Sequence, residues 1–391
     1  MRAADRVAIG AAIAYVGVLG AKAALAGVAV ARRRARVRRA TADPVAPGEL
    51  TVVQPILSGD PQLEQALVAT LEACPDARVL WLVDQRDPEG WRIAEAARAR
   101  HPLARVEIVD CPPCPPGTGP KAFKLALAEG LLTTEAFAVI DDDTRVTPAG
   151  ITALLDGLQI ADVSTGLPTY EPGPGEWSRL VAEFVNDQAI LTYLPTSASG
   201  SARAINGMTW AMRRSTLQRL GGFGPLQRLI ADDLAIAGRV RAAGGRIDQT
   251  EVPQVVSTTV SDGRSYRHLM HRWMVFARLG LRAEPSGWRV GLAAAYALPP
   301  VLLATAVGLA VARPSGPRVA AALVAVASRS AVIAAAQRAV TGRVRHDPAR
   351  SIAAELLLPV QFAGALVDRR IVWRSGRYRV HANDRFEAVA A

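Results

Sequence analysis

The sequence predicts an α/β domain with a mostly parallel sheet and flanking helices, held between helices that span a membrane. Strand-length apolar runs alternate with amphipathic helical stretches from residue 49 to residue 285. The apolar stretch Val7–Ala31 precedes this region, and three more apolar stretches follow it. An apolar helix of about 20 residues or more crosses a hydrocarbon core of about 30 Å. The chain is therefore expected to be an integral membrane protein.

A run dominated by arginine, residues 32–39, directly follows the first apolar stretch. By the positive-inside rule, this end of the predicted helix is cytosolic. The third C-terminal apolar stretch is short and contains Glu355 and Pro359, which favours a re-entrant or interfacial segment. We expect an N-terminal transmembrane helix (1–31), a basic juxtamembrane linker (32–48), a cytosolic catalytic domain (49–285), transmembrane or interfacial helices (286–372) and a basic tail (373–391).

The 391 residues carry a formal net charge of +11. The arginines cluster beside apolar stretches, which favours membrane anchoring over nucleic-acid binding. The sequence contains neither a zinc-finger pattern nor a basic stripe interleaved with aromatic residues, so we expect no nucleic-acid partner. Its abundance of alanine and arginine is typical of a bacterium with GC-rich DNA, which indicates a bacterial inner membrane.

The apolar run Phe137–Ile140 ends in three consecutive aspartates, residues 141–143. In extended backbone, Asp141 and Asp143 point to the same side. Carboxylate oxygens suit Mg²⁺ or Mn²⁺, and such an ion would hold the phosphates of a nucleotide. The alternative is a solvated acidic turn.

Two further stretches fit a phosphate-bearing ligand. Residues 117–121 open a helix with two glycines and Lys121, a combination that favours anions, although a solvated lysine is an equal alternative. Asp232 and Asp233 begin another predicted helix, where capping alone explains acidic residues. The absence of GxGxxG and Walker motifs disfavours dinucleotide dehydrogenases and P-loop enzymes.

Four features then coincide in chain order, and distinctive strings accompany them. The features are Asp84 after the second strand, the Asp141/Asp143 pair, Asp232–Asp233, and Arg272–Trp273 before the apolar helices. The strings include Gln54–Gly59, Gly119–Lys121, Asn206–Met208 and, most distinctive, Trp373–Arg379. With these, nearly the whole chain resembles the ceramide glucosyltransferase family of inverting, membrane-bound glycosyltransferases with the GT-A fold.

The resemblance implies a UDP-sugar donor, with UDP-glucose the first choice, and a membrane lipid acceptor, either ceramide or another hydroxyl lipid. It also implies inversion at the anomeric carbon. One alternative is a processive polysaccharide synthase, although Leu269 and only three C-terminal apolar stretches argue against it. Another is a transporter or scaffold that uses intramembrane residues such as Lys22 and Arg329.

The resemblance also implies roles in donor binding. Asp84 matches the aspartate that contacts the nucleotide base, and Asp87 is the second candidate. Asp141 matches the DxD-type position. Asp143 completes a DxD motif that the animal ceramide enzymes lack.

For catalysis, the family's base falls on Asp233, and Asp232 replaces the usual Glu. The family's Q/RxxRW motif falls on residues 269–273, where Arg272 and Trp273 match. Leu269 departs from the expected Gln or Arg, so the polar contact made there is expected to differ.

These residue types also suggest a mechanism that does not depend on the family resemblance. A lipid hydroxyl attacks the anomeric carbon, and a carboxylate takes its proton. Lys121 and Arg272 offset the charge of the departing diphosphate. Trp273 either contacts the sugar or acceptor, or marks the membrane interface. We also expect the helices at 176–194 and 265–282 to lie at the membrane surface.

Overall fold

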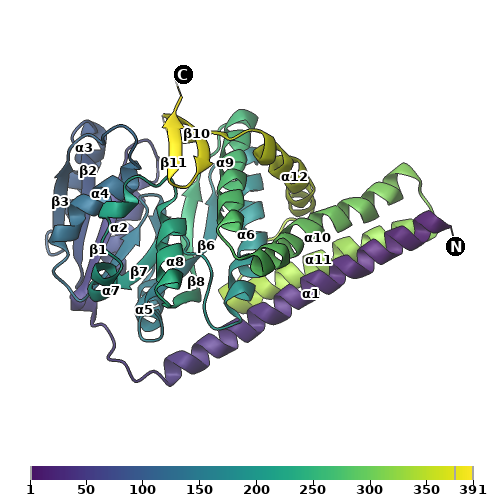
Figure 1. Cartoon of the computed structure of the whole chain (residues 1–391), viewed down its shortest axis with the longest axis horizontal. Coiled ribbons are helices and arrows are strands. Elements are labelled where there is room, and N and C mark those ends of the chain that lie inside the picture. The colour runs from purple at the N-terminus through teal and green to yellow at the C-terminus, as the bar shows by residue number, and fades with distance from the viewer. Residues whose placement is uncertain (1, 374–375, 390–391) are drawn as a thin grey trace.

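An eight-stranded sheet forms the centre of the expected catalytic domain in the computed structural model, which describes residues 2–373 and 376–389 (Figure 1). The strand order is β3-β2-β1-β4-β7-β6-β8-β5. The strands are β1 (Leu50–Ile56), β2 (Arg78–Asp84), β3 (Arg105–Cys111), β4 (Ala136–Ile140), β5 (Thr144–Arg145), β6 (Val163–Pro172), β7 (Thr209–Arg213) and β8 (Ile247–Thr258).

The sheet is mixed: four of its seven strand pairings are parallel, as expected of a mostly parallel sheet, and three are antiparallel. Strands β1 to β4 pair in parallel, as do β6 and β8, but β7 runs antiparallel between β4 and β6. Because Thr209 at the start of β7 pairs with Ile140 at the end of β4, the loop before β7 lies beside the three aspartates.

Helices cover both faces of the sheet. One apolar core lies against α2, α3 and α5, and the other lies against α4, α7 and α8. These helices are α2 (Leu63–Ala73), α3 (Pro88–Arg100), α4 (Pro120–Ala128), α5 (Pro148–Gly157), α7 (Arg214–Arg219) and α8 (Asp232–Ala242), with short 3₁₀ turns at Pro47–Glu49, Glu129–Leu131 and Gly224–Leu226. Two longer helices, α6 (Glu176–Ser197) and α9 (Gly263–Arg282), connect this domain to the remaining helices.

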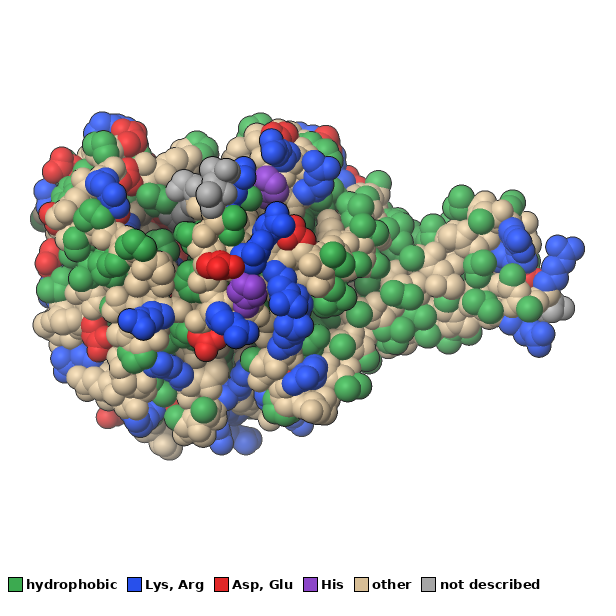
Figure 2. Space-filling model, turned by 45° about the horizontal axis from the view of Figure 1, so that its top comes forward, with side chains coloured by type: hydrophobic (Ala, Val, Ile, Leu, Met, Phe, Trp, Pro, Cys, Tyr) green, Lys and Arg blue, Asp and Glu red, His purple; other side chains and the backbone are tan. Residues whose placement is uncertain are grey.

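An apolar arm of three helices extends from the domain: α1 (Ala3–Arg38), α10 (Ser286–Ala312) and α11 (Gly316–Thr341) (Figure 1). Figure 2 shows hydrophobic side chains along the flank of this arm and charged side chains at its tip. At the tip, Asp5 pairs with Arg318 at 2.8 Å. Together with α12 (Pro348–Val367), these helices are long and apolar enough to cross a membrane.

Helix α1 continues seven residues past its predicted end at residue 31, so the expected linker begins only after Arg38. Arginine is a good helix former, and these arginines contact the catalytic domain. The Arg33 Nε atom lies 2.9 Å from an Asp248 carboxylate oxygen, and Arg34 Nε lies 2.8 Å from Glu251. The arginine run therefore attaches the helical arm to the domain through these ion pairs.

Polar side chains of the helical arm pair with buried carboxylates of α6 and α12. Arg329 is 2% exposed, and it contacts Glu355 at 2.9 Å and Asp187 at 3.6 Å. The Tyr15 hydroxyl donates to Glu355 at 3.1 Å. These partners give Arg329 a structural role.

The chain returns to the catalytic domain at its C-terminus. Helix α12 is unbroken and packs on α6 and α9 (Figure 1). An antiparallel sheet of β9 (Arg370–Trp373), β10 (Gly376–Ala382) and β11 (Arg385–Ala388) then begins before the predicted tail boundary at residue 373. Its Ile371 and Val380 join an apolar cluster with Ile230 and Val275, so the expected tail is a folded element. Arg374 and Ser375 of the distinctive tail string lie outside the described residues.

Replacing Arg33 by methionine is expected to destabilise the protein by about 3–5 kcal/mol, because Asp248 and Glu251 would then lack their buried partner. The Arg33 side chain is only 10% exposed. Arg34→Met is the matched control, because Arg34 is 56% exposed and its loss should cost less than about 1 kcal/mol. Unfolding followed in detergent measures both, and equal losses would contradict the assignment.

Candidate active site

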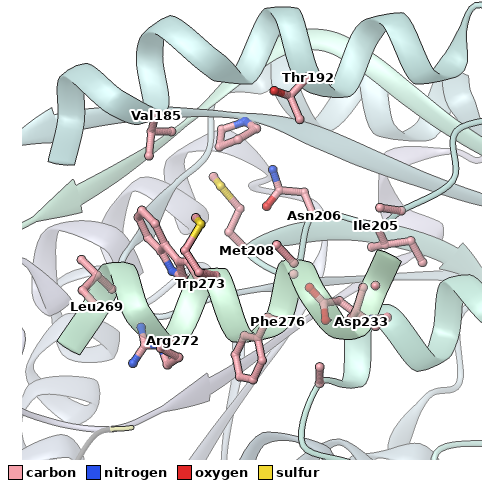
Figure 3. Close-up of a pocket in the computed structure, with 18 of the residues that line it drawn as sticks. Val185, Thr192, Ile205, Asn206, Met208, Asp233, Leu269, Arg272, Trp273 and Phe276 are labelled. Carbon is pink, nitrogen blue, oxygen red and sulfur yellow. Dashed lines mark hydrogen bonds between the residues drawn. The ribbon is translucent and has the colours of Figure 1, made fainter. Parts of the chain in front are cut away.

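A cavity of about 1280 Å³ opens at the carboxyl ends of the central strands and continues between α6, α9, α10 and α12. Eight of the nine residues expected from the sequence line it: Asp84, Lys121, Asp141, Asp143, Asp232, Asp233, Arg272 and Trp273. Figure 3 shows α6 contributing Val185 and Thr192 on one side, and α9 contributing Leu269, Trp273 and Phe276 on the other. The cavity thus joins a charged end to an apolar wall.

Lys121 is the centre of the charged end. Its Nζ atom lies 2.6 Å from Asp141 Oδ1 and 3.9 Å from Asp232 Oδ2, and it donates to the Gly207 carbonyl at 2.7 Å. Burial lowers the pKa of Lys121, but the charges of Asp141 and Asp232 outweigh this effect and raise the pKa above its usual value. One ammonium group therefore connects the end of β4 with the start of α8.

Two glycines allow this close packing. A Cβ at Gly119 would lie 2.8 Å from the Leu229 carbonyl oxygen, so the turn before Lys121 packs directly against the segment before α8. A Cβ at Gly207 would lie 3.0 Å from Asp233 Oδ2. Steric constraints therefore explain why glycine is present at these two positions of the predicted motifs.

Asp233 lies in the first turn of α8, and Oδ1 accepts a hydrogen bond from the Leu234 N–H at 2.7 Å. Desolvation and the neighbouring Asp232 raise the pKa of Asp233 to about 7, although Lys121 opposes this shift. A carboxylate with such a pKa is suited to accept a proton near neutral pH.

The three consecutive aspartates have different surroundings. All three border the cavity, but Asp142 also accepts from the Leu57 N–H at 2.7 Å, which fixes the turn. Desolvation and the charges of Asp141 and Asp142 raise the pKa of Asp143 to about 7. Crowded carboxylates of this kind fit a divalent cation, and their oxygens suit Mg²⁺ or Mn²⁺.

The structure distinguishes between Asp84 and Asp87, the two aspartates expected from the sequence to contact the nucleotide base. Asp84 borders the cavity, and its carboxylate accepts from the Arg86 N–H at 2.8 Å. Asp87 does not border it. Instead, Asp87 caps α3 through the Gly90 N–H at 2.9 Å and accepts from the Ser58 N–H at 2.7 Å, which indicates a structural role.

Arg272 and Trp273 lie on different flanks of α9 (Figure 3). Trp273 stacks on Phe184 with ring centroids 6.2 Å apart and meets Tyr170 edge-on at 6.0 Å. The guanidinium carbon of Arg272 lies 6.0 Å from the centre of the Trp373 ring. Leu269, where the family motif has a polar residue, belongs to the apolar wall near Trp273.

A family model described as Glycosyl transferase family 21 matches residues 12–386. The chain belongs to glycosyltransferase family 21. This confirms the expected family and the expected α/β fold of GT-A type. No curated protein matches the chain.

Three solved structures are similar to parts of this chain. The mannosyltransferase PcManGT from Pyrobaculum calidifontis, in complex with GDP-Man and Mn²⁺, has 18% identity and a TM-score of 0.49 over 90% of this chain and 98% of that chain. S. aureus TarS with UDP-GlcNAc has 12% identity and a TM-score of 0.37 over 88% and 99%. Glucosyl-3-phosphoglycerate synthase from Mycobacterium tuberculosis, in complex with Mn²⁺, UDP and phosphoglyceric acid, has 17% identity and a TM-score of 0.36 over 61% and 81%.

A second acidic group in this family 21 protein lies apart from the three aspartates. Ligand atoms of Glu183, Asp187 and His346 lie within 4.8 Å of one another, a spacing that a metal ion would accept. His346 Nδ1 lies 3.1 Å from Asp187 and 3.3 Å from Glu183. Burial lowers the pKa of His346, but the hydrogen bonds and charges of both carboxylates raise it to about 9. The resulting imidazolium holds the loop before α12 against α6.

Sequence reasoning missed Asn383, in the turn between β10 and β11. Its side-chain amide accepts from the Ala231 N–H at 2.8 Å and donates to the Ala231 carbonyl at 3.0 Å, while its backbone carbonyl accepts from the Ile230 N–H at 3.0 Å. Ala231 directly precedes Asp232 and Asp233. The distinctive tail string was the available signal, but it ends four residues before Asn383.

Replacing Asn383 by alanine is expected to lower kcat about 10–100-fold, because a displaced α8 start misplaces Asp233. The KM for the donor should change less than kcat, since Lys121 keeps its 2.6 Å contact with Asp141 when α8 shifts. The neighbouring, exposed Asp384→Ala is the control and should leave kcat unchanged. Steady-state kinetics decide, and a wild-type kcat for the Asn383 variant would remove this positioning role.

Proposed function

We propose that this family 21 protein transfers a hexose from a UDP-sugar, with UDP-glucose the first choice, to a hydroxyl of a membrane lipid. The observation that carries the proposal is the single cavity in which a lysine–carboxylate centre meets an apolar wall. The wall includes Phe184 of α6, Ala297 of α10 and Phe362 of α12. A water-soluble acceptor would gain little from such a wall, whereas an acyl chain would bury apolar surface there.

The donor is assigned to the charged end of the cavity. Asp84 is the candidate for the nucleotide base, and Asp141 and Asp143 would hold Mg²⁺ or Mn²⁺. When bound, such an ion neutralises phosphate charge. Lys121 and Arg272 supply further positive charge for the leaving diphosphate.

Asp233 is proposed as the general base. The lipid hydroxyl loses its proton to the Asp233 carboxylate while its oxygen forms a bond to the anomeric carbon. The bond from that carbon to the diphosphate oxygen breaks, and the electron pair leaves with UDP. Asp232 helps keep Lys121 in place through its 3.9 Å contact, and Trp273 borders the acceptor side.

The acceptor class is a hydroxyl lipid such as ceramide. Helices α6 and α9 form the route to the site, because both pack against α12 and α6 also packs against α1. We propose a cytosolic catalytic domain in a bacterial inner membrane, since Arg32–Arg39 follow the first span. The C-terminal sheet packs against Ile230 of this domain, which supports a cytosolic side for the sheet as well.

A screen of radiolabelled nucleotide sugars with total lipid extract tests the function. Purified protein should label an organic-soluble product from a UDP-hexose, and mass spectrometry should show a gain of one hexose. Transfer only to a water-soluble acceptor, or from none of the donors, would overturn the proposal.

Replacing Asp233 by asparagine should lower kcat about 10²–10⁴-fold, the range typical of a lost general base. Asparagine has the same shape as aspartate and keeps the Oδ1 acceptor for the Leu234 N–H, so folding and UDP binding should persist. In the wild type, activity should rise with pH through about 7, because Asp233 must be ionised to accept the proton. A variant that binds UDP and turns over at the wild-type rate would exclude Asp233.

Removing divalent cations should abolish transfer, because Asp141 and Asp143 would repel the donor diphosphate without a counter-ion. Adding Mn²⁺ or Mg²⁺ back should restore activity. Asp143→Asn should raise the metal concentration needed for half-maximal activity, whereas Glu183→Gln serves as a control and should not. Full activity after thorough chelation would rule out the metal assignment.

A further inference from the structure

A second cavity, of about 740 Å³, lies where α1 reaches the catalytic domain. Its wall comes from the C-terminal part of α1, the loop after α6, the end of α8 with the following turn, and the junction of α9 and α10. Four arginines line it: Arg36, Arg203, Arg241 and Arg246. Among the described residues, no aspartate or glutamate does.

Only part of this positive charge is neutralised. Arg203 Nε donates to Glu284 Oε2 at 2.6 Å, and Arg241 Nη1 lies 3.1 Å from Glu284 Oε1. Desolvation lowers the pKa of Arg241, and Arg203 lowers it further against the pull of Glu284. One carboxylate thus serves two guanidinium groups.

The other two arginines have no carboxylate at hydrogen-bond distance in the described part of the chain. Arg36 donates to the carbonyls of Gly200 and Ile160, at 2.5 and 2.9 Å. The guanidinium of Arg246 has no ion pair there, and Arg246 is exposed. The cavity therefore has a net positive charge that an anion would offset.

The position of the cavity along α1 indicates where that anion comes from. The apolar part of α1 ends at Ala31, and Arg36 follows five residues later. At about 1.5 Å per residue, Arg36 lies about 8 Å beyond the hydrocarbon edge. The headgroup layer on each side of a bilayer is about 5–8 Å thick. The cavity is therefore at headgroup depth.

The start of α10 provides a second marker of this depth. Trp288 lies in the first turn of α10, is 40% exposed, and has the guanidinium carbon of Arg203 4.5 Å from its ring centre. Exposed tryptophans at the ends of spanning helices concentrate at the membrane–water interface. The end of α1 and the start of α10 both lie beside the cavity, and both indicate that it is at headgroup depth.

We infer that this cavity binds the phosphate of an anionic phospholipid headgroup. Guanidinium groups match phosphate oxygens in geometry and charge, and Ser199 and Ser201 add hydroxyls to the wall. A soluble phosphate has the same chemistry. The depth of the cavity favours the lipid, because a lipid phosphate is already concentrated there.

Occupancy of this cavity would act on the catalytic centre through shared elements. Helix α8 has Asp232 and Asp233 at its start and borders this cavity at its end. The loop with Arg203 continues into Asn206 and Gly207 beside Lys121. Anionic lipid would therefore hold both elements in place and raise the transfer rate.

The test is binding of short-chain phosphatidylglycerol to the full-length protein in a neutral detergent, with phosphatidylcholine as comparison and inorganic phosphate as a separate arm. Phosphatidylglycerol should raise the melting temperature and bind at least tenfold tighter than phosphatidylcholine. Arg246→Gln should weaken its binding about fivefold, the effect of removing one arginine from an anionic membrane contact. Arg246→Glu should weaken it further.

Arg343→Gln is the control, because Arg343 is also exposed and lies just past the end of the candidate span α11, close to the membrane, yet does not line this cavity. Its binding should stay within twofold of wild type. Equal binding of both lipids, equal losses in both glutamine variants, or inorganic phosphate alone matching phosphatidylglycerol would each overturn the inference. Because binding is read without sugar transfer, failure here is distinct from failure of the proposed function.

Discussion

The contact between Lys121 and the two carboxylates Asp141 and Asp232 is the constraint on which the rest of the site depends. It joins the end of β4 to the start of α8, two segments about 90 positions apart in the sequence. Without the ammonium group, several carboxylates would face one another in a partly desolvated cavity, which is costly. The glycines that permit this contact and the Asn383 clamp behind α8 both preserve its geometry.

A second constraint is the attachment of the helical arm to the catalytic domain. Arg33 reaches Asp248 and Glu251 from α1, and α12 leads into a sheet that packs beside Ile230. The cavity receives its apolar wall from elements held in this way. The proposed transfer to a lipid depends on this fixed placement, because the acceptor would enter along the membrane helices while the proposed base lies on the α/β domain.

The sequence identified the main strands, the apolar helices and eight of the residues that line the cavity, because each has a local signal in period, composition or motif. It did not predict the mixed pairing around β7, since strand direction depends on tertiary contacts. It also placed the end of α1 at residue 31 instead of Arg38. An arginine run resembles a solvated linker unless the carboxylates that pair with it are known. Asp87 could not be separated from Asp84 by spacing alone. The role of Asn383 depends on a contact across about 150 residues, which no local pattern encodes.

The central claim is a single displacement, in which the lipid hydroxyl attacks the donor carbon directly while Asp233 takes its proton. The most direct test is the anomeric configuration of the lipid glycoside, read from the proton coupling constant of the anomeric hydrogen by NMR. A single displacement predicts that an α-linked UDP-sugar gives a β-linked product. An α-linked product would contradict the account, because retention requires a second displacement or a different reaction path.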